Sequence, residues 1–148
     1  MANITNLCDA PEFAEAIADR VWREWWSTDE VSLKNFRTGI EHMATDRDIP
    51  LAFAAHERAR YIGSVLLIEH DLDACPQYSP WIAALWVEPE FRSRGIAGDL
   101  IFSARTEAGR LGFSKCYLCA TDANSPYYEA RGFRMVERAV DGLNVFSI

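Results

Sequence analysis

The stretch from residue 81 to residue 98 reads WIAALWVEPEFRSRGIAG, and it decides the fold that we expect. Its first seven residues are apolar throughout, which is typical of a β-strand that is buried on both faces. After residue 98, apolar residues recur at helical spacing as far as a glycine-containing segment at 109–112. The stretch therefore predicts a central strand, a basic turn that contains glycine, and a long helix.

The turn between this strand and this helix has the properties of an anion-binding site. The first amides of a helix have no partners within the helix, and the helix dipole adds partial positive charge there. Gly95, Ala97 and Gly98 are small enough for a phosphate to approach the backbone, and Arg92 and Arg94 add positive charge. The spacing matches neither the Gly-Lys-Ser/Thr ending of a nucleoside triphosphate loop nor the G-x-G-x-x-G dinucleotide fingerprint. The turn therefore predicts a site for a diphosphate.

The rest of the chain combines helices and extended segments. Two amphipathic helices are expected before the first clear sheet: one that Asp9 caps and whose apolar stripe runs from Phe13 to Trp25, and one over residues 32–44. Apolar, β-branched and aromatic runs then predict a hairpin. The other expected elements are hairpin strands at 51–55 and 61–68, a strand at 115–121, a short helix at 125–131, and extended pieces at 135–136 and 143–146. This order predicts a mixed α/β fold.

Length and charge narrow the possible functions. A chain of 148 residues, 49% of them hydrophobic, is expected to form a single domain over residues 1–148. The net charge of −7 disfavours nucleic acid and anionic membrane surfaces as partners and favours a cationic small molecule or a basic peptide. The first nine residues lack the features of a signal peptide, and the four cysteines are too few and unevenly placed for a disulfide framework. We expect a cytoplasmic protein with reduced thiols.

Two motifs resemble those of a known enzyme family. Residues 92–97, RSRGIA, are similar to the acetyl-CoA signature Q/R-x-x-G-x-G/A of the GNAT superfamily of N-acyltransferases, and Val87-Glu88-Pro89 resembles the V-x-P at which that family's central strand ends. Residues 127–133, YYEARGF, are similar to the family's F-Y-E-x-x-G-F segment and follow one helix and one strand later, as in the family. The chain is identified as a member of this family, which implies a mostly antiparallel central sheet with splayed central strands and flanking helices.

The resemblance also implies roles for individual residues. Acetyl-CoA would be the acetyl donor, with no metal required. The implied general acid for the departing thiolate is Tyr128, four residues before Gly132, while the adjacent Tyr127 takes that role if the register is shifted. The residues implied to bind the cofactor are Leu85, Trp86 and Val87 along the pantetheine arm, Arg92, Ser93, Arg94, Gly95, Ile96, Ala97 and Gly98 around the pyrophosphate, and Asn124 near the thiol.

The general base for the attacking amine stays open. Some members of the family place a glutamate within the central strand, and the equivalent position here is Ala83. Glu69, Asp71 and Asp73 lie before the central strand and could attract and deprotonate a cationic acceptor, directly or through water. His70, beside Asp71, is a further candidate for contact with the acceptor. None of these alternatives is preferred by the sequence.

Several other residues permit both structural and functional interpretations. Cys116 and Cys119 are expected to be buried small residues, because residues three apart on a strand point to opposite faces and zinc needs more ligands. Three indoles on the first helix cannot all face one apolar stripe, so at least one is expected to line the acceptor cleft or a subunit interface, and a homodimer is compatible with this. Glu129 and Arg131 are expected to be surface residues.

The expected function is transfer of an acetyl group from acetyl-CoA to a primary amine, by direct attack of the amine. By charge, the acceptor is expected to be cationic. The candidates are an aminoglycoside or polyamine, a free amino acid or small metabolite, and a protein N-terminus or lysine. The alternative is a non-catalytic acyl-CoA-binding sensor with the same fold.

Overall fold

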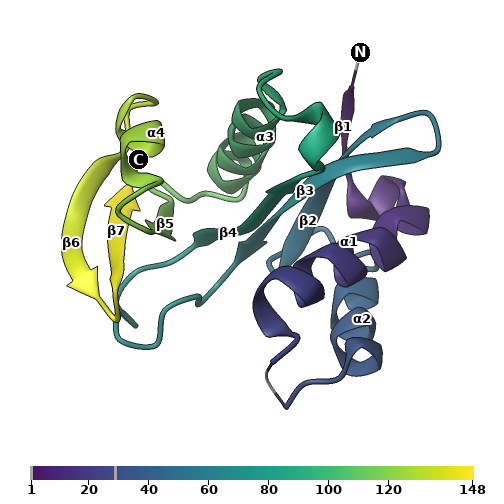
Figure 1. The fold of residues 1–148 in the computed structure, drawn as a ribbon, viewed down its shortest axis with the longest axis horizontal. Helices are drawn as coiled ribbons and strands as arrows, with labels where there is room; N and C mark the ends of the chain where they lie inside the picture. The colour runs from purple at the N-terminus through teal and green to yellow at the C-terminus, as the bar shows by residue number, and fades with distance from the viewer. Residues whose placement is uncertain (1, 29) are drawn as a thin grey trace.

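The computed structural model describes residues 2–28 and 30–148, and within these residues seven strands form one mixed sheet with helices on both faces (Figure 1). The strand order across the sheet is β1-β2-β3-β4-β5-β7-β6. The strands are β1 (Asn3–Asn6), β2 (Leu51–Glu57), β3 (Arg60–Ile68), β4 (Trp81–Val87), β5 (Tyr117–Ala120), β6 (Arg134–Val140) and β7 (Leu143–Ser147). Neighbouring strands are antiparallel except β4 and β5, which confirms the predicted mixed, mostly antiparallel sheet.

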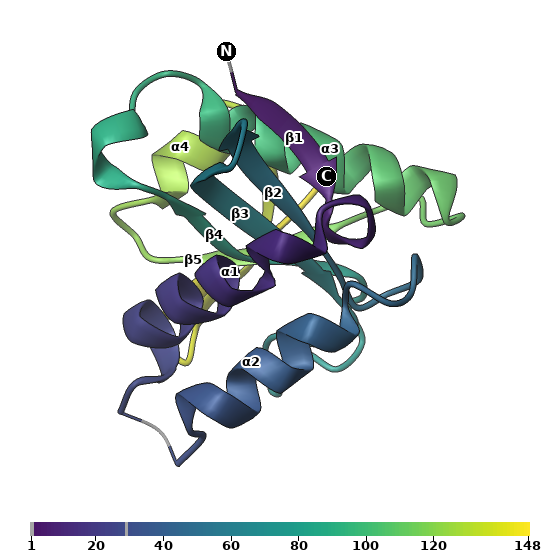
Figure 2. The same cartoon turned by 90° about the vertical axis from the view of Figure 1, so that its right-hand side faces the viewer.

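The helical elements fill the expected places. They are α1 (Ala14–Val21), α2 (Leu33–His42), α3 (Ile96–Arg110) and α4 (Ser125–Glu129), with a π-helical turn η3 (Trp22–Trp26) and the short 3-10 turns η1 (Leu7–Asp9), η2 (Pro11–Phe13) and η4 (Pro89–Phe91). Figure 2 shows α1 and α2 on the near side of the sheet and α3 on the far side. In the described part of the chain, no helix has the length and apolarity needed to cross a membrane.

Alternation along the strands gives the sheet two buried faces. In β2, Leu51, Phe53 and Ala55 pack in the cluster that contains the apolar residues of α3, whereas Ala52 and Ala54 pack in the cluster formed by α1 and α2. This period of two is the expected geometry of a strand. Because both faces are covered, the apolar runs of β2 and β3 are nearly continuous, as the sequence indicated.

The N-terminal region differs from the expectation in three ways. Residues 3–6 form β1 at the edge of the sheet, so a strand precedes the helices. Asp9 does not cap the first helix; instead its carboxylate pairs with Arg47, and Asn6 caps η1 through the amide of Cys8. The apolar stripe ends at Val21, because the wider π-helical turn η3 rotates the following residues and leaves Trp25 44% exposed.

Strands β4 and β5 diverge from one another. In the chain as described, they pair at one position, Trp81 with Tyr117, and then separate (Figure 1). Ala84 has a φ of 52°, and the register of β3 against β4 shifts between Ser64 and Leu66. The sequence predicted that β4 is buried on both faces. This is wrong for residues 84–86, which are half-buried because the strand separates from β5. This splay opens the sheet next to the start of α3.

Candidate active site

A groove lies at the start of α3, where the sequence predicts a diphosphate site. The chain leaves β4, makes the turn η4, and reaches α3 through Gly95, which has a φ of 81° and serves as the N-cap. Because glycine has no side chain, the N-cap residue itself leaves the first amides of α3 free. The groove has a volume of about 440 Å³ and is called here the helix-start groove. Its lining residues are Glu24, Trp25, Leu85, Trp86, Val87, Phe91, Arg92, Ser93, Gly95, Ile96, Ala97, Asn124, Tyr127 and Arg131.

Two of the residues implied for the cofactor lie outside this lining. Arg94 stacks its guanidinium 5.3 Å from the centre of the Phe91 ring, and Gly98 lies within the first turn of α3. A Cβ on Gly98 would lie 3.8 Å from Nε of Arg131, so the arginine side chain covers this turn. The groove thus brings together nine of the eleven implied cofactor residues.

Aromatic rings hold the cations of the groove. Arg92 donates from Nε to the carbonyl oxygen of Val87 at 2.8 Å, and its guanidinium lies 4.8 Å from the centre of the Trp86 ring. Arg131 lies 3.4 Å from the centre of the Tyr127 ring and donates to the carbonyl oxygen of Tyr127 at 3.0 Å. Stacking of this kind fixes a guanidinium while its outer N–H groups stay exposed.

The sequence had placed Arg131 on the surface without a role. The side chain is exposed, yet it lines the helix-start groove with Arg92 and so adds a second cation there. The spacing of four from Tyr127 to Arg131 was the available signal, because residues four apart in a helix share one side.

A second cavity lies in the splay between β4 and β5 and is called the splay pocket. Its volume is about 500 Å³. Its lining residues are Trp25, Trp26, Asp71, Leu72, Ile82, Ala83, Ala84, Leu85, Leu118, Cys119, Ala120, Thr121, Asn124, Tyr128 and Leu143. Trp25, Leu85 and Asn124 line both the splay pocket and the helix-start groove, so the two cavities adjoin. A ligand bound at the start of α3 can therefore extend into the splay.

Tyr128 lies in the splay pocket, whereas Tyr127 lines the helix-start groove. Tyr128 packs edge-on against Phe133, with ring centres 5.8 Å apart, and its hydroxyl has no hydrogen-bond partner among residues 2–28 and 30–148. Burial raises the pKa of Tyr128 to about 12, with smaller contributions from Tyr127 and Cys119. The phenol therefore stays protonated at neutral pH and is able to donate its proton.

Asn144 anchors the helix that carries Tyr128. This residue of β7 is 3% exposed, and its Nδ2 donates to Oγ of Ser125 at 3.0 Å and to Oδ1 of Asp122 at 2.7 Å. Ser125 Oγ in turn donates to the carbonyl oxygen of Thr121 at 2.8 Å. These bonds fix the first turn of α4 against β7, which sets the positions of Asn124 and Tyr128. No motif or spacing in the sequence indicates this network.

The structure separates the three carboxylates that were alternatives for the base. Asp71 lines the splay pocket and is half-buried, whereas Glu69 and Asp73 are exposed and lie outside its lining. His70 is also exposed and does not line the pocket. Ala83, at the position of the family's strand glutamate, forms part of the pocket wall. Asp71 is thus the candidate that the fold brings near Tyr128.

The carboxylate of Asp71 has one sulfur partner. Cys119 Sγ donates to Oδ2 of Asp71 at 3.4 Å. Burial raises the pKa of Asp71, and it raises the pKa of the Cys119 thiol to about 12, helped by the charge of Asp71. Both cysteines are free thiols, and Cys116 is buried as expected. The expectation was wrong for Cys119, which is half-buried because β5 separates from β4 and exposes it to the splay pocket. No group of His, Cys, Asp and Glu in the described chain could hold a metal.

The indoles of η3 meet the expectation that at least one of the three lines a cleft. Trp25 and Trp26 both line the splay pocket, with ring centres 6.4 Å apart at 69°. Trp26 also stacks on Phe36 of α2 at 5.1 Å. Trp22 is half-buried and donates from Nε1 to the carbonyl oxygen of Val31 at 2.8 Å, so its role is structural.

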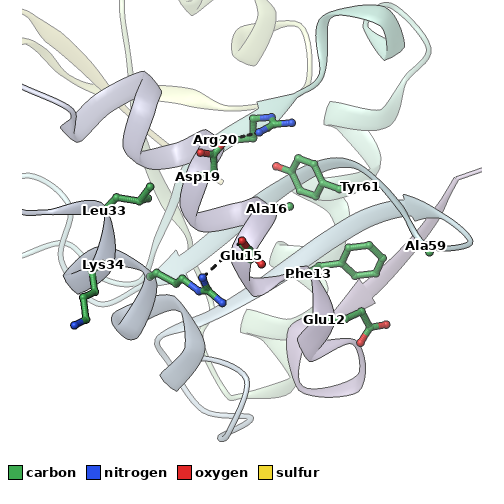
Figure 3. A pocket seen from close by; sticks show the side chains of 11 residues that line it. Glu12, Phe13, Glu15, Ala16, Asp19, Arg20, Leu33, Lys34, Ala59 and Tyr61 are labelled. Atoms are coloured by element: carbon green, nitrogen blue, oxygen red, sulfur yellow. Dashed lines mark hydrogen bonds and ion pairs between the residues drawn. The ribbon is translucent and has the colours of Figure 1, made fainter.

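A larger cavity, about 720 Å³, lies between α1, α2 and the start of β3 (Figure 3). Tyr61 and Phe13 form part of its wall, and Glu15 pairs with Arg37 across it at 3.6 Å. It shares no lining residue with the helix-start groove or the splay pocket. None of the residues implied for the cofactor or for catalysis lines it, so its size does not make it the candidate active site.

The family assignment follows from comparison with family models. The model of the acetyltransferase (GNAT) domain matches residues 49–135, which include β4, the signature turn, α3 and α4. The chain belongs to the GNAT family of acetyltransferases. The matched residues contain both motifs on which the resemblance was based. A search of the curated proteins found no match.

Solved GNAT structures have the same fold. An acyl-CoA N-acyltransferase from Pseudomonas aeruginosa is 13% identical, with a TM-score of 0.70 over 99% of this chain and 97% of that one. The aminoglycoside N-acetyltransferase AAC(6')-Iy in complex with CoA is 19% identical, with a TM-score of 0.74 over 95% and 92%. A predicted acetyltransferase with acetyl-CoA from Clostridium acetobutylicum is 17% identical, with a TM-score of 0.68 over 95% and 94%. At these identities the likeness concerns the fold.

Proposed function

We propose that this GNAT protein transfers an acetyl group from acetyl-CoA to a primary amine. The observation that carries the proposal is the continuity between two cavities: the free amides at the start of α3 open into the helix-start groove, and that groove adjoins the splay pocket that contains Tyr128. The first cavity suits a diphosphate and the second suits a thioester and its acceptor. The CoA complexes of AAC(6')-Iy and of the C. acetobutylicum protein support acetyl-CoA as the donor.

The donor would lie along the end of β4. The pyrophosphate would bind the amides of residues 95–98, with Arg92 and Arg131 at its sides. The backbone of Leu85, Trp86 and Val87 would pair with the pantetheine arm, because β3 occupies one edge of this segment and β5 has moved away from the other. Asn124, which lines both cavities, would lie near the thiol end.

The acetyl group would then reach the splay pocket beside Tyr128. A neutral amine attacks the thioester carbonyl, and the carbon–sulfur bond breaks as the phenol donates its proton to the leaving thiolate. The net charge of −7 supports a cationic acceptor, because it attracts such a molecule to the protein. The four free thiols support a reducing compartment, and we place the protein in the cytoplasm.

A second candidate function rests on Ala83. Without a carboxylate at this position of the strand, the protein could bind acyl-CoA as a sensor and lack turnover. The two candidates share the donor site and differ in the chemistry of the splay pocket.

Release of free thiol from acetyl-CoA, measured on the purified protein against a panel of primary amines, tests the proposal. Amine-dependent release with conversion of the amine to its amide is the expected result. Binding of acetyl-CoA, seen as a rise in Tm, without release for any amine would support the sensor instead. Absence of both binding and release would contradict both candidates.

A further inference from the structure

The charged side chains that line the splay pocket indicate which kind of amine the pocket can bind. Among its described lining residues, Asp71 is the one carboxylate, and none is Lys, Arg or His. Eleven of the other lining residues are aliphatic or aromatic, and they are Trp25, Trp26, Leu72, Ile82, Ala83, Ala84, Leu85, Leu118, Ala120, Tyr128 and Leu143. The pocket therefore offers one negative group in an apolar surround.

The position of the Asp71 carboxylate is set by β5. Oδ2 accepts the thiol hydrogen of Cys119 at 3.4 Å, which leaves Oδ1 without a partner among the residues that the structure describes. A carboxylate that is half-buried among apolar groups gains much from a bound ammonium, because few water molecules compete with the ammonium there. One carboxylate can balance the charge of one ammonium group.

Two indoles also line the splay pocket. Trp26 is fixed by stacking on Phe36, and the ring of Trp25 meets it edge-on with ring centres 6.4 Å apart. The two indoles add aromatic surface to the pocket lining, on which an apolar or aromatic carbon body can pack. Among the described residues that line the splay pocket, no second carboxylate accompanies them to bind a second ammonium group.

We propose that the acceptor is a small primary monoamine with an apolar or aromatic body, whose nitrogen binds Asp71 and whose body lies on Trp25 and Trp26. This inference rests on the proposed acetyl transfer. A polycation such as an aminoglycoside or a polyamine would place further ammonium groups against the apolar lining without a counter-charge. Such acceptors are therefore poor substrates, although the aminoglycoside acetyltransferase AAC(6')-Iy has the same fold.

Asp71 also accepts the proton that the amine must lose. The ammonium gives one proton to the Asp71 carboxylate, the nitrogen lone pair forms the bond to the acetyl carbon, and the carbon–sulfur bond breaks. The thiolate takes the phenolic proton of Tyr128. The acylated nitrogen still carries one excess proton, and this proton passes through water to the tyrosinate and restores the phenol. Asp71 then releases its proton to solvent, so the products are one amide, one free thiol and one proton.

The test compares acceptors at fixed acetyl-CoA concentration. Tryptamine, phenethylamine and hexylamine are measured against spermidine, kanamycin and a peptide with a free N-terminus. The expected kcat/KM for the monoamines is about tenfold or more above that for the other acceptors. Higher kcat/KM for spermidine, kanamycin or the peptide would overturn the inference while leaving acetyl transfer intact.

Two variants locate the effect in the pocket. Asp71→Asn is expected to raise KM for tryptamine and to lower kcat, with binding of acetyl-CoA unchanged. Asp73→Asn is the matched control, because Asp73 is exposed and outside the pocket lining. Thermal unfolding establishes that both variants fold. Equal kinetics for Asp71→Asn and Asp73→Asn would overturn the role of Asp71.

A binding measurement keeps the inference testable if no amine is turned over. Ligand-detected NMR of tryptamine with CoA present is expected to show binding to the parent and to Asp73→Asn, and weaker binding to Asp71→Asn. No binding, or equal binding to all three proteins, would overturn the inference. Failure of acetyl-CoA itself to bind is a different result, and it would contradict the proposed function.

Discussion

The carboxylate of Glu88, at the end of β4, binds the guanidinium of Arg20, which lies 68 residues earlier in the chain. Arg20 Nε donates to Oε1 of Glu88 at 2.7 Å, and Trp86 Nε1 donates to Oε2 at 3.2 Å. The Glu88 side chain is 12% exposed. Since Arg92 lies over the ring of Trp86, this carboxylate connects α1 to the wall of the helix-start groove.

Replacement of Glu88 by Gln should loosen this connection. In glutamine an NH2 group replaces one of the two oxygens that accept from Arg20 and Trp86, so one of these donors faces another donor, and the negative charge is lost. Because Arg20 is 39% exposed and retains Asp19 as a partner, we expect a loss of only about 1–2 kcal/mol in the free energy of unfolding. We also expect a higher KM for acetyl-CoA with little change in kcat, measured by thiol release.

Glu90→Gln is the matched control for this substitution. Glu90 pairs with Arg60 at 3.2 Å, but the two side chains are 57% and 61% exposed. Exposed pairs contribute about 0–1 kcal/mol, so neither the stability nor the KM should change noticeably. If both variants behaved alike, the bridge through Glu88 would have no special part in positioning Trp86.

Gly63 tests the close approach of β3 to the end of β4. A Cβ at this position would lie 2.6 Å from the carbonyl oxygen of Trp86 and 3.3 Å from Cα of Val87. Gly63→Ala should therefore push the end of β4 away and lower the free energy of unfolding by about 1–3 kcal/mol, measured by urea denaturation. Gly39→Ala, in α2 with nothing within 4 Å, should raise stability by about 0.4–1 kcal/mol. A Gly63→Ala protein as stable as the parent would contradict the packing described here.

The sequence was sufficient for the strand-turn-helix unit, because its signals are local. An apolar run, a positive-φ glycine and a helical stripe all lie within residues 81–110, and the structure has them in that order. The edge strand β1 was missed because a four-residue strand has almost no pattern of its own, and Asn3–Asn6 is ordered by pairing with β2.

Long-range contacts explain what the sequence could not provide. The splay depends on where β5 leaves β4. Asp71 lies in the splay pocket and contacts Cys119, 48 residues away, whereas Glu69 and Asp73 lie outside the pocket. The anchoring of α4 by Asn144 is likewise a contact between distant segments. No spacing in the chain indicates such partners before the fold is known.

Gly95 should bind acetyl-CoA through its backbone. The effect of a substitution on backbone conformation can be separated from its effect on acetyl-CoA binding. Gly95 has a φ of 81°, and Gly112, after the far end of α3, has a φ of 96°. Alanine at either position should cost about 1–2 kcal/mol of stability, because the left-handed conformation disfavours a Cβ. Only Gly95→Ala should also weaken acetyl-CoA binding, measured by calorimetry. Equal affinities of the two variants would place the cofactor away from the start of α3.

The half-buried carboxylate of Asp71 should make the free energy of unfolding dependent on pH. Burial raises its pKa above the ordinary value of 3.8, while Cys119 is the titratable group in hydrogen-bond contact with it. The folded state therefore favours the protonated carboxyl, and this contribution to stability is lost as the pH rises through the folded-state pKa. Asp71→Asn, which stays neutral, should exceed the parent in Tm at pH 7 and match it near pH 3.5. A lower Tm than the parent at pH 7 would contradict this sign.

Tyr128 provides the most direct test of the chemistry. Its pKa of about 12 keeps the phenol protonated across the neutral range, so it can protonate the thiolate but does not act as a base at pH 7. Tyr128→Phe keeps the ring that packs on Phe133 and removes the proton donor. We expect kcat to fall by about 10²-fold or more, with the affinity for acetyl-CoA unchanged, measured by thiol release and calorimetry.

Tyr127→Phe is the control, because Tyr127 lies beneath Arg131 in the helix-start groove and outside the splay pocket. Its kcat should stay close to that of the parent. The parent's kcat should also show no decline that is due to Tyr128 below about pH 10, since a group with a pKa of about 12 is still protonated there. If Tyr128→Phe retained the parent's kcat while Tyr127→Phe lost it, the acid would be Tyr127, and the thiolate would have to leave toward the helix-start groove rather than into the splay.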